Sequence, residues 1–221
     1  MIDKLLKIIA PHYCLGCDKT GTLLCDNCKY NISFDPYERC LGCGLPAGAS
    51  GVCGTCQLPY SKAWCVGERR DELKELIKTY KFGRAKSAGY VLGDLLLEKL
   101  PELPPHTVVV PIPTIAKHVR QRGHDHARLI AGHIAKKKSL KLEHALFRIT
   151  NTTQRGASSA QRAKQAKEAF QLSGSILPDV PYLIVDDVVT TGATIRYGAQ
   201  CLKDAGVSDV WVAAIARNPL D

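Results

Sequence analysis

The sequence predicts an α/β fold, with a mostly parallel sheet and helices on both of its faces, preceded by a small cysteine-rich module. From Trp64 onward, strand-like apolar segments alternate with helix-like segments, which is typical of parallel sheets with helical crossovers. Before that point, eight of the ten cysteines fall in the first 56 residues. A chain of 221 residues has room for one ordinary domain and a small appendage. We therefore expect a module over residues 1–60 and a domain over residues 61–221.

The expected elements follow from apolar periodicity and from the turn residues between apolar runs. Strands are expected at residues 63–67, 107–111, 144–149, 182–185 and 209–216. Helices are expected at residues 71–80, 86–99, 115–119, 125–137, 159–169 and 193–205, with a polar loop at 150–158.

The apolar runs are far shorter than the roughly 20 residues that cross a bilayer, so no membrane span is expected. The first ten residues contain Asp3 and lack the long apolar stretch and cleavage site of a secretory signal. The sequence therefore predicts a cytoplasmic protein.

The net charge of +9 is concentrated in one part of the chain. Residues 117–168 contain thirteen lysines and arginines against three acids. Such a stretch either faces an anionic partner or is a solvated surface, and charge alone favours neither interpretation.

The cysteines form four Cys-x-x-Cys pairs, a pattern with a specific chemical use. Each pair aims two thiolates at one point, and two pairs complete the tetrahedral shell of a zinc ion. A disulfide framework is disfavoured without an export signal, and redox dithiols rarely recur in tandem. We expect two zinc ions, whether the pairs combine sequentially or interleave. The ligands would be Cys14, Cys17, Cys25, Cys28, Cys40, Cys43, Cys53 and Cys56.

The most informative segment of the domain is residues 182–194, which read YLIVDDVVTTGAT. The apolar run predicts a buried strand, so Asp186 and Asp187 should emerge at its carboxyl end, where open α/β sheets bind ligands. These carboxylates can accept hydrogen bonds from a ribose diol. Amides and hydroxyls that follow at a helix N-terminus can bind phosphate. The alternative is a capped helix start without a ligand. The phosphate-binding residues would be Thr190, Thr191, Gly192, Ala193 and Thr194.

A second segment, VVVPIP at residues 108–113, predicts a strand that ends in two prolines, Pro111 and Pro113. Judged alone, the prolines are equally consistent with a simple strand terminator. The four histidines His118, His124, His126 and His133 are interpreted as solvated surface residues rather than metal ligands.

With these motifs in order, the chain resembles a known family. Residues 182–194 resemble the signature of type I phosphoribosyltransferases, and nearly the whole chain resembles the ComF family of competence proteins, also called the ComFC or GntX type. His124, Asp125 and His126 depart from the Phe-Asn-Gln that usually follows the Arg-Gly element, and Gln165 stands where Asn is common. Besides the cysteines and residues 185–194, the match is carried by Lys81, Phe82, Gly83, Pro111, Pro113, Arg120, Arg122, Gly123, Gln154, Arg162, Ala169 and Phe170.

The resemblance implies a role in natural transformation, in which a cytoplasmic protein handles incoming single-stranded DNA and meets DNA-uptake or recombination proteins. It also implies a phosphoribosyl pyrophosphate site with Mg²⁺, in which Asp186 and Asp187 act on the ribose. In this interpretation Pro111 and Pro113 border the pyrophosphate, Lys81 reaches a phosphate, and Arg155 in the 150–158 loop meets leaving-group charge.

Two functions therefore compete at the level of sequence. One is a DNA-uptake factor that contacts phosphates of single-stranded DNA through basic residues. The other is a metabolic phosphoribosyltransferase with a small acceptor, and a sensor that binds without chemistry is a weaker third. Whether transfer is catalysed is left open. The basic residues of the first hypothesis are Lys117, Arg120, Arg122, Arg128, Lys136 and Lys137.

Overall fold

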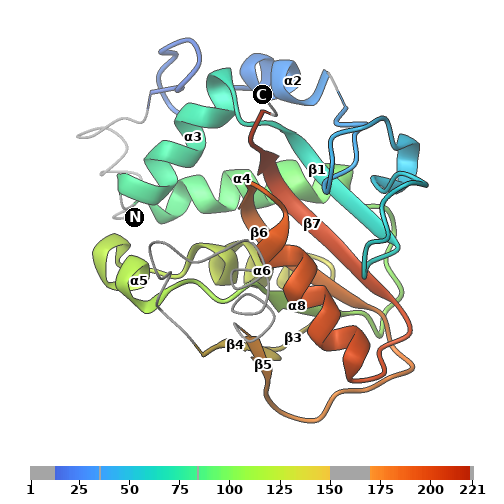
Figure 1. Ribbon diagram of the computed structural model, residues 1–221. Helices are drawn as coiled ribbons and strands as arrows, with labels where there is room; N and C mark the ends of the chain where they lie inside the picture. The colour runs from blue at the N-terminus through green and yellow to red at the C-terminus, as the bar shows by residue number, and fades with distance from the viewer. Residues whose placement is uncertain (1–12, 35, 84, 150–169, 220–221) are drawn as a thin grey trace, which may run out of the picture.

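The computed structural model describes residues 13–34, 36–83, 85–149 and 170–219. Its centre is a five-stranded sheet in which every neighbouring pair is parallel (Figure 1). The strand order is β1-β7-β6-β2-β3. The strands are β1 (Lys62–Glu68), β2 (Val108–Pro111), β3 (Lys141–Leu142), β6 (Tyr182–Val189) and β7 (Val210–Arg217).

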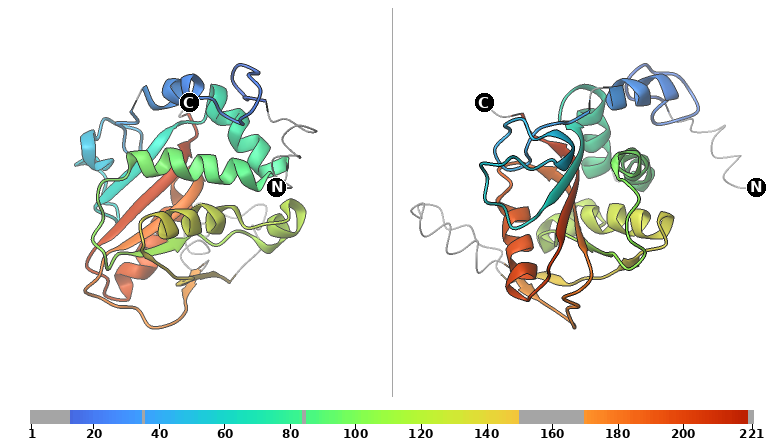
Figure 2. Two further views of the ribbon diagram at one scale, coloured as in Figure 1. Left: turned by 180° about the vertical axis from the view of Figure 1, so that it is seen from behind. Right: turned by 90° about the vertical axis from the view of Figure 1, so that its right-hand side faces the viewer.

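Helices cover both faces of this sheet, as predicted (Figure 2). The helices α3, α4 and α6 pack on one face, while α8 packs on the other through Ile195, Ala199 and Leu202, which recur at helical spacing. A shorter helix, α5, precedes α6. The bounds are α3 (Asp71–Phe82), α4 (Lys86–Lys99), α5 (Ala116–Arg122), α6 (His126–Lys137) and α8 (Ala193–Asp204).

The two central strands form the core of the molecule. All eight residues of β7 are buried, and β6 is buried from Tyr182 to Val185. Strands that are covered on both faces read as continuous apolar runs, because both side-chain orientations meet a helix layer. In β7 the run ends at Arg217, which is buried as well.

Strand β6 is longer than the sequence predicted. It continues through Val189, so Asp186 and Asp187 lie within the strand and not beyond its end. Asp186 is opposite Ala214 of β7, and Val189 is opposite Arg217. The expected strand at 144–149 is shorter, β4 (Leu146–Arg148), and pairs antiparallel with β5 (Phe170–Leu172), which the sequence did not predict. The loop at 150–158 and the helix at 159–169 lie outside the described residues.

The cysteine-rich part consists of two loops joined by an unexpected helix, α2 (Asp26–Phe34), with a 3-10 turn, η1 (Gly48–Ser50), in the second loop. Figure 1 shows the first loop beside α3 and the second beside β1. The loops share one backbone design. The amide of Asp18 donates to the carbonyl of Cys14 at 2.8 Å, and Gly44 donates to Cys40 at the same distance. The two loops are therefore structural repeats.

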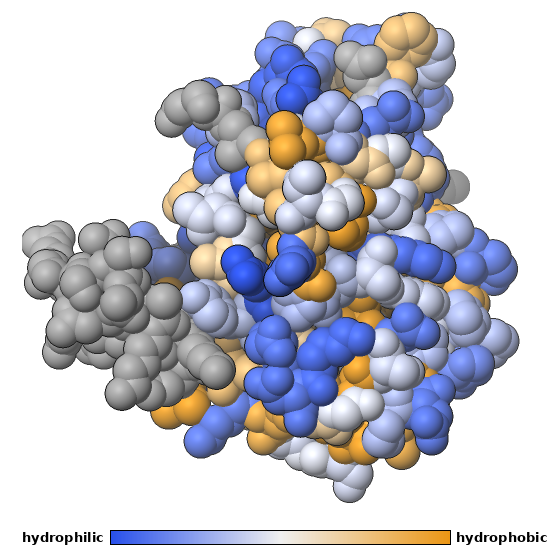
Figure 3. Space-filling view, turned by 45° about the vertical axis from the view of Figure 1, so that its right-hand side comes forward, coloured by the Kyte–Doolittle hydropathy of each residue, from blue (hydrophilic) through white to orange (hydrophobic). Residues whose placement is uncertain are grey.

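The face that Figure 3 brings forward carries hydrophilic side chains interspersed with smaller hydrophobic groups. Within the described ranges, the helices are all too short or too polar to cross a bilayer.

Candidate functional site

The structure gathers the eight paired cysteines into two groups of four. One group consists of Cys14, Cys17, Cys25 and Cys28 and the other of Cys40, Cys43, Cys53 and Cys56, and in each group the sulfurs lie within 4.8 Å of one another. The combination is therefore sequential, one of the two arrangements that the sequence left open.

The geometry of both groups fits zinc. Cys17 and Cys25 have sulfurs 3.5 Å apart, and so do Cys43 and Cys53. Four sulfurs at about 2.3 Å from a tetrahedral ion are separated by roughly 3.8 Å, close to these values. The amide of Cys25 donates to the sulfur of Cys14 at 3.3 Å, which supports a thiolate there. None of the ten cysteines forms a disulfide bond, so all eight paired sulfurs are available to a metal.

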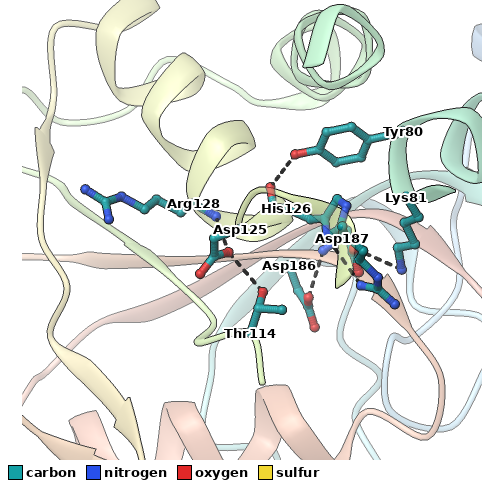
Figure 4. Close-up of polar contacts among 9 residues, drawn as sticks. Tyr80, Lys81, Thr114, Asp125, His126, Arg128, Asp186 and Asp187 are labelled. Carbon is teal, nitrogen blue, oxygen red and sulfur yellow. Dashed lines mark hydrogen bonds and ion pairs between the residues drawn. The ribbon is translucent and has the colours of Figure 1, made fainter. Parts of the chain in front are cut away.

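In β6, Asp186 and Asp187 point to opposite faces of the sheet, because successive strand residues alternate. Asp187 faces α3, where its Oδ2 lies 2.9 Å from Nζ of Lys81. Both side chains are largely buried, at 15% exposure for Lys81 and 13% for Asp187. Lys81 thus reaches a carboxylate in this structure. Figure 4 shows Asp186 pointing away from Lys81.

Asp186 accepts a hydrogen bond of 2.8 Å from the amide of Asp187. Burial raises the pKa of the Asp186 carboxyl above its usual range, and the nearby charge of Asp187 raises it further. Lys81 and Arg148 oppose this shift. A cation beside this carboxyl would oppose the shift and favour the ionised form.

One histidine, His126, is buried on the same side of the sheet as Asp187. This differs from the sequence prediction that the four histidines are solvated. His126 is 1% exposed, and its ring contacts Tyr80 edge-on at 4.6 Å between centroids. Arg122 lies 3.3 Å from Nδ1 of His126. Because a guanidinium can only donate, Nδ1 accepts and the ring is neutral. Burial accordingly lowers the pKa of His126 to about 4.

The loop after β6 is open to solvent. Thr190 and Thr191 are exposed, and Gly192 has a φ of 75°, a left-handed conformation that glycine adopts without strain. The amides of residues 190–192 donate no hydrogen bond to another described residue, and the amide of Ala193 has only a 3.4 Å contact to Oγ1 of Thr191. The hollow inside the loop measures about 20 Å³, so an anion would bind at its mouth. The first turn of α8, with Thr194, adds further unpaired amides.

The proline segment runs beside the first half of β6, just before the acidic pair. Pro111 is the last residue of β2 and lies opposite Val185, while Pro113 follows the strand and is half-buried. The next residue, Thr114, donates a 2.9 Å hydrogen bond to Asp125. Asp125 also accepts from the amide of Arg128 and thereby caps α6 (Figure 4). The cap ties the proline segment to α6.

Three of the six predicted DNA-contacting residues line one cavity of about 950 Å³ beside α6, namely Arg128, Lys136 and Lys137. Lys86 and Tyr90 of α4 line its other side. Lys117 and Arg120 are exposed on α5, and Arg122 lies over the ring of Phe82. The structure thus places three of these six basic residues in the wall of a cavity and the other three on α5.

Sequence reasoning missed Tyr80, Thr114 and the functional placement of Asp125 and His126. The hydroxyl of Tyr80 donates to the backbone oxygen of His126 at 2.8 Å, a contact across 46 residues that no local pattern reveals. Asp125 could have been found, because an aspartate before an apolar-periodic segment is a helix-cap signal. Arg155 lies outside the described residues.

Two four-cysteine loops in front of a parallel sheet with helices on both faces define a ribbon module joined to an α/β domain. A double zinc ribbon domain model matches residues 5–57. The chain is 31% identical to competence protein F of Haemophilus influenzae over 215 residues, covering 88% of this chain and 90% of that protein. It therefore belongs to the ComF family of competence proteins.

Other relatives agree with this family. The chain is 25% identical to competence protein ComFC of Bacillus subtilis, covering 85% of this chain and 81% of the relative. It is 31% identical to the DNA utilization protein YhgH of Escherichia coli K12, with coverages of 88% and 90%.

Among solved structures, a hypoxanthine phosphoribosyltransferase from Staphylococcus aureus aligns with a TM-score of 0.37 at 15% identity, covering 63% of this chain and 66% of that chain. A purine phosphoribosyltransferase from Pyrococcus horikoshii aligns with a TM-score of 0.34 at 14% identity, with coverages of 62% and 84%. Scores this low add nothing to the fold assignment, which rests on the sheet itself.

Proposed function

We propose that this protein binds phosphoribosyl pyrophosphate with Mg²⁺ at the carboxyl end of β6 and acts in DNA uptake in the cytoplasm. The observation that carries the proposal is the open loop that begins at residue 190, just beyond the strand that holds two carboxylates, and in which the amides of residues 190–192 donate to no other described residue. Amides at a helix N-terminus favour a terminal phosphate, and carboxylates favour a hard cation and hydroxyls.

Each residue of the site has a task in this proposal. The loop amides and the hydroxyls of Thr190, Thr191 and Thr194 would hold the 5-phosphate. Asp186 would face the ribose and its Mg²⁺ from the side of the phosphate loop. Asp187, which points to the α3 side, would add its charge beside Lys81. In the free protein Lys81 neutralises Asp187, and on binding it would share its charge with a phosphate oxygen.

The remaining site residues act on the pyrophosphate. The backbone at Pro111 and Pro113 would border it, since Ile112 between them hydrogen-bonds to Val185 at 2.9 Å beside the acidic pair. Arg155 is proposed to meet its charge from the 150–158 loop. The two four-cysteine groups would each hold one zinc ion.

The DNA part of the proposal is supported by the names of the relatives, which concern competence and DNA utilization, and by the basic cavity. Lys86, Arg128, Lys136 and Lys137 surround a space large enough for several phosphates, and the half-exposed ring of Tyr90 offers a surface on which a base can stack. We propose that single-stranded DNA binds there, with DNA-uptake or recombination proteins as further partners.

The ligand proposal is tested by calorimetric titration with phosphoribosyl pyrophosphate and Mg²⁺. We expect the double variant Asp186→Ala and Asp187→Ala to lose affinity by more than about a hundredfold, because the cation and the diol lose their acceptors. Zinc content should not change. The matched control is Asp179→Ala with Asp209→Ala, which removes two exposed acids away from the loop. Equal affinity in both double variants would refute the proposal.

The DNA proposal is tested by measuring the affinity for a single-stranded oligonucleotide over a series of salt concentrations. Replacing Lys136 and Lys137 by Ala should lower the slope of log affinity against log salt by about 1.4, since each lost phosphate contact removes roughly 0.7. Lys74→Ala with Lys78→Ala removes two exposed lysines of α3 that do not line the cavity and should leave the slope unchanged. A wild-type affinity that does not depend on salt would exclude this site.

A further inference from the structure

The two four-cysteine loops repeat one backbone design but pack on different parts of the α/β domain. In the first loop, Cys14 and Cys28 join the core cluster of α3 and α4 through residues such as Leu76. In the second, Leu41 joins the core cluster that contains Val189 and Ile195, the residues on either side of the phosphate loop. Among the described residues of the two loops, those of the second therefore share a core cluster with the element that we propose binds phosphate.

The contact between the second loop and the phosphate loop is close. A side-chain carbon added at Gly192 would lie 3.3 Å from the carbonyl oxygen of Leu41. A cavity of about 300 Å³ beside this contact is lined by Cys43 and Cys56 on one side and by residues 191–193 on the other. The second cysteine group and the phosphate loop are thus two walls of one space.

A buried arginine joins the same two parts. Arg217, at the end of β7, is 1% exposed. Its Nη1 lies 3.5 Å from the carbonyl oxygen of Val189, directly before the phosphate loop, and its Nη2 lies 3.4 Å from that of Gly42, between two metal-binding cysteines. Its Nε has no partner among the described residues, and Arg217 makes no ion pair with any of them.

A buried guanidinium needs a counter-charge, because burial of an unpaired ion is costly. Glu68 lies opposite Arg217 on β1, but its carboxylate pairs with Arg70 at 3.1 Å. A zinc ion with four thiolates carries a net charge of about −2. Tyr60, 3% exposed, lines the same cavity as Cys43 and Cys56, and the guanidinium contacts Gly42 of the same loop, so the cysteine group and Arg217 lie side by side.

We propose that Arg217 is a positioning residue that couples metal occupancy of the second cysteine group to the conformation of the phosphate loop, while the first group is uncoupled. Metal binding to the second group would displace the protons of its four thiols, and the resulting net charge of about −2 would hold Arg217 in place. Arg217 in turn fixes the carbonyl of Val189 and the start of the loop.

The coupling is measured without any ligand, by amide hydrogen exchange of a peptide covering residues 189–197. We compare Cys40→Ser with Cys43→Ser against Cys14→Ser with Cys17→Ser, since each double change disables one group. Exchange in this peptide should rise by about tenfold or more in the first variant and stay at the wild-type rate in the second. Equal exchange in the two variants would overturn the coupling.

A milder variant keeps the test decisive where a cysteine change unfolds the protein. Arg217→Lys keeps the positive charge but has one nitrogen in place of two, so it cannot hold both carbonyls. In Arg217→Lys, one of the two zinc ions should be released to a colorimetric chelator about fivefold faster or more. Amide exchange should also rise in the peptide covering residues 189–197. Exchange of the α4 peptide should be unaffected. Unchanged zinc release and exchange in this variant would refute the proposal.

A last arm rests on the proposed function. Saturation with Mg²⁺ and phosphoribosyl pyrophosphate should slow release of the same zinc ion, because coupling between two sites is reciprocal. Failure of the wild type to bind this ligand would refute the proposed function while the exchange results still decide the coupling. Binding without any effect on zinc release would instead refute the coupling.

Discussion

The two faces of β6 differ in whether the aspartate on each face has an ion-pair partner. On the α3 face, Asp187 has Lys81 as its partner, and the neighbouring His126 and Tyr80 are buried and in contact. On the α8 face, Asp186 leads into a loop whose amides donate to no described residue. The ion pair of Asp187 is formed within the protein itself, whereas under the proposed function a ligand would complete the face of Asp186.

The largest loss of stability is expected on the α3 face. Lys81→Met leaves the Asp187 carboxylate nearly buried without a partner, which should lower the free energy of unfolding by about 2–3 kcal/mol. Urea denaturation measures this. Lys78→Met is the control, because its ion pair with Glu75 is 3.2 Å long but exposed and contributes less than about 0.5 kcal/mol. Similar losses in the two variants would show that the α3 face is not specially satisfied.

The next largest effect is a pH dependence of stability that comes from His126 on the α3 face. Because burial lowers the pKa of His126 to about 4, the folded state binds fewer protons than the unfolded state between that value and about 6.5. The contribution of His126 is therefore present above pH 6.5 and is lost as the pH falls towards 4, by on the order of 2 kcal/mol. Nearby Arg122 and Lys81 strengthen the shift, and Asp187 opposes it.

This pH effect is checked by thermal or urea unfolding at several pH values. His126→Gln should flatten the profile between pH 6.5 and 4, while His106→Gln, at an exposed position, should leave it as in the wild type. A profile that keeps its slope in His126→Gln would contradict the assignment.

A smaller effect is expected at the start of α8. Gly192→Ala should destabilise the protein by about 1–2 kcal/mol, because alanine is strained at a φ of 75° and its Cβ approaches Leu41. Gly206 also has a positive φ, 92°, but a side chain there meets nothing within 4 Å. The difference between the two alanine variants in urea unfolding isolates the close approach, and no difference would mean that the second cysteine loop does not constrain this turn.

The smallest effect on stability is expected on the α8 face, in the loop after β6. Thr191→Ala removes an exposed hydroxyl with one long contact, so unfolding should change by less than about 0.5 kcal/mol. Affinity for phosphoribosyl pyrophosphate should nevertheless fall by about tenfold, since one phosphate donor is lost. Thr22→Ala is a control on the first cysteine loop, and its ligand affinity should equal that of the wild type. A loss of stability without a loss of affinity in Thr191→Ala would show that this loop stabilises the fold and does not bind the ligand.

Much of the fold was predictable from the sequence because its strands are buried on both faces. Continuous apolar runs such as residues 209–216 marked β7 to within one residue. The prediction for β6 ended too early, because two adjacent acids look like the end of a strand. The fold keeps them in the strand by giving Asp187 a lysine from α3, which is tertiary information. Strand β3 has only two residues, too few to form a recognisable pattern.

The candidate site shows the same division. The cysteine pairs, the acidic pair and the Thr-Thr-Gly turn are local motifs, and each was identified from spacing. The pairing of Lys81 with Asp187 and the bridge from Arg217 to Gly42 join residues more than 100 positions apart. Such contacts depend on the strand order, which local patterns do not encode.

The place of β7 in the sheet has a consequence for synthesis on the ribosome. It is the last described strand along the chain, yet it lies between β1 and β6 and is the only strand that pairs with β1. While the nascent chain is shorter than residue 210, β1 therefore has an unpaired, aggregation-prone edge. The four cysteines of each loop lie close together in the sequence, so each group can bind metal before that stage. The ribbon can therefore fold before β7 has been synthesised and the sheet is complete.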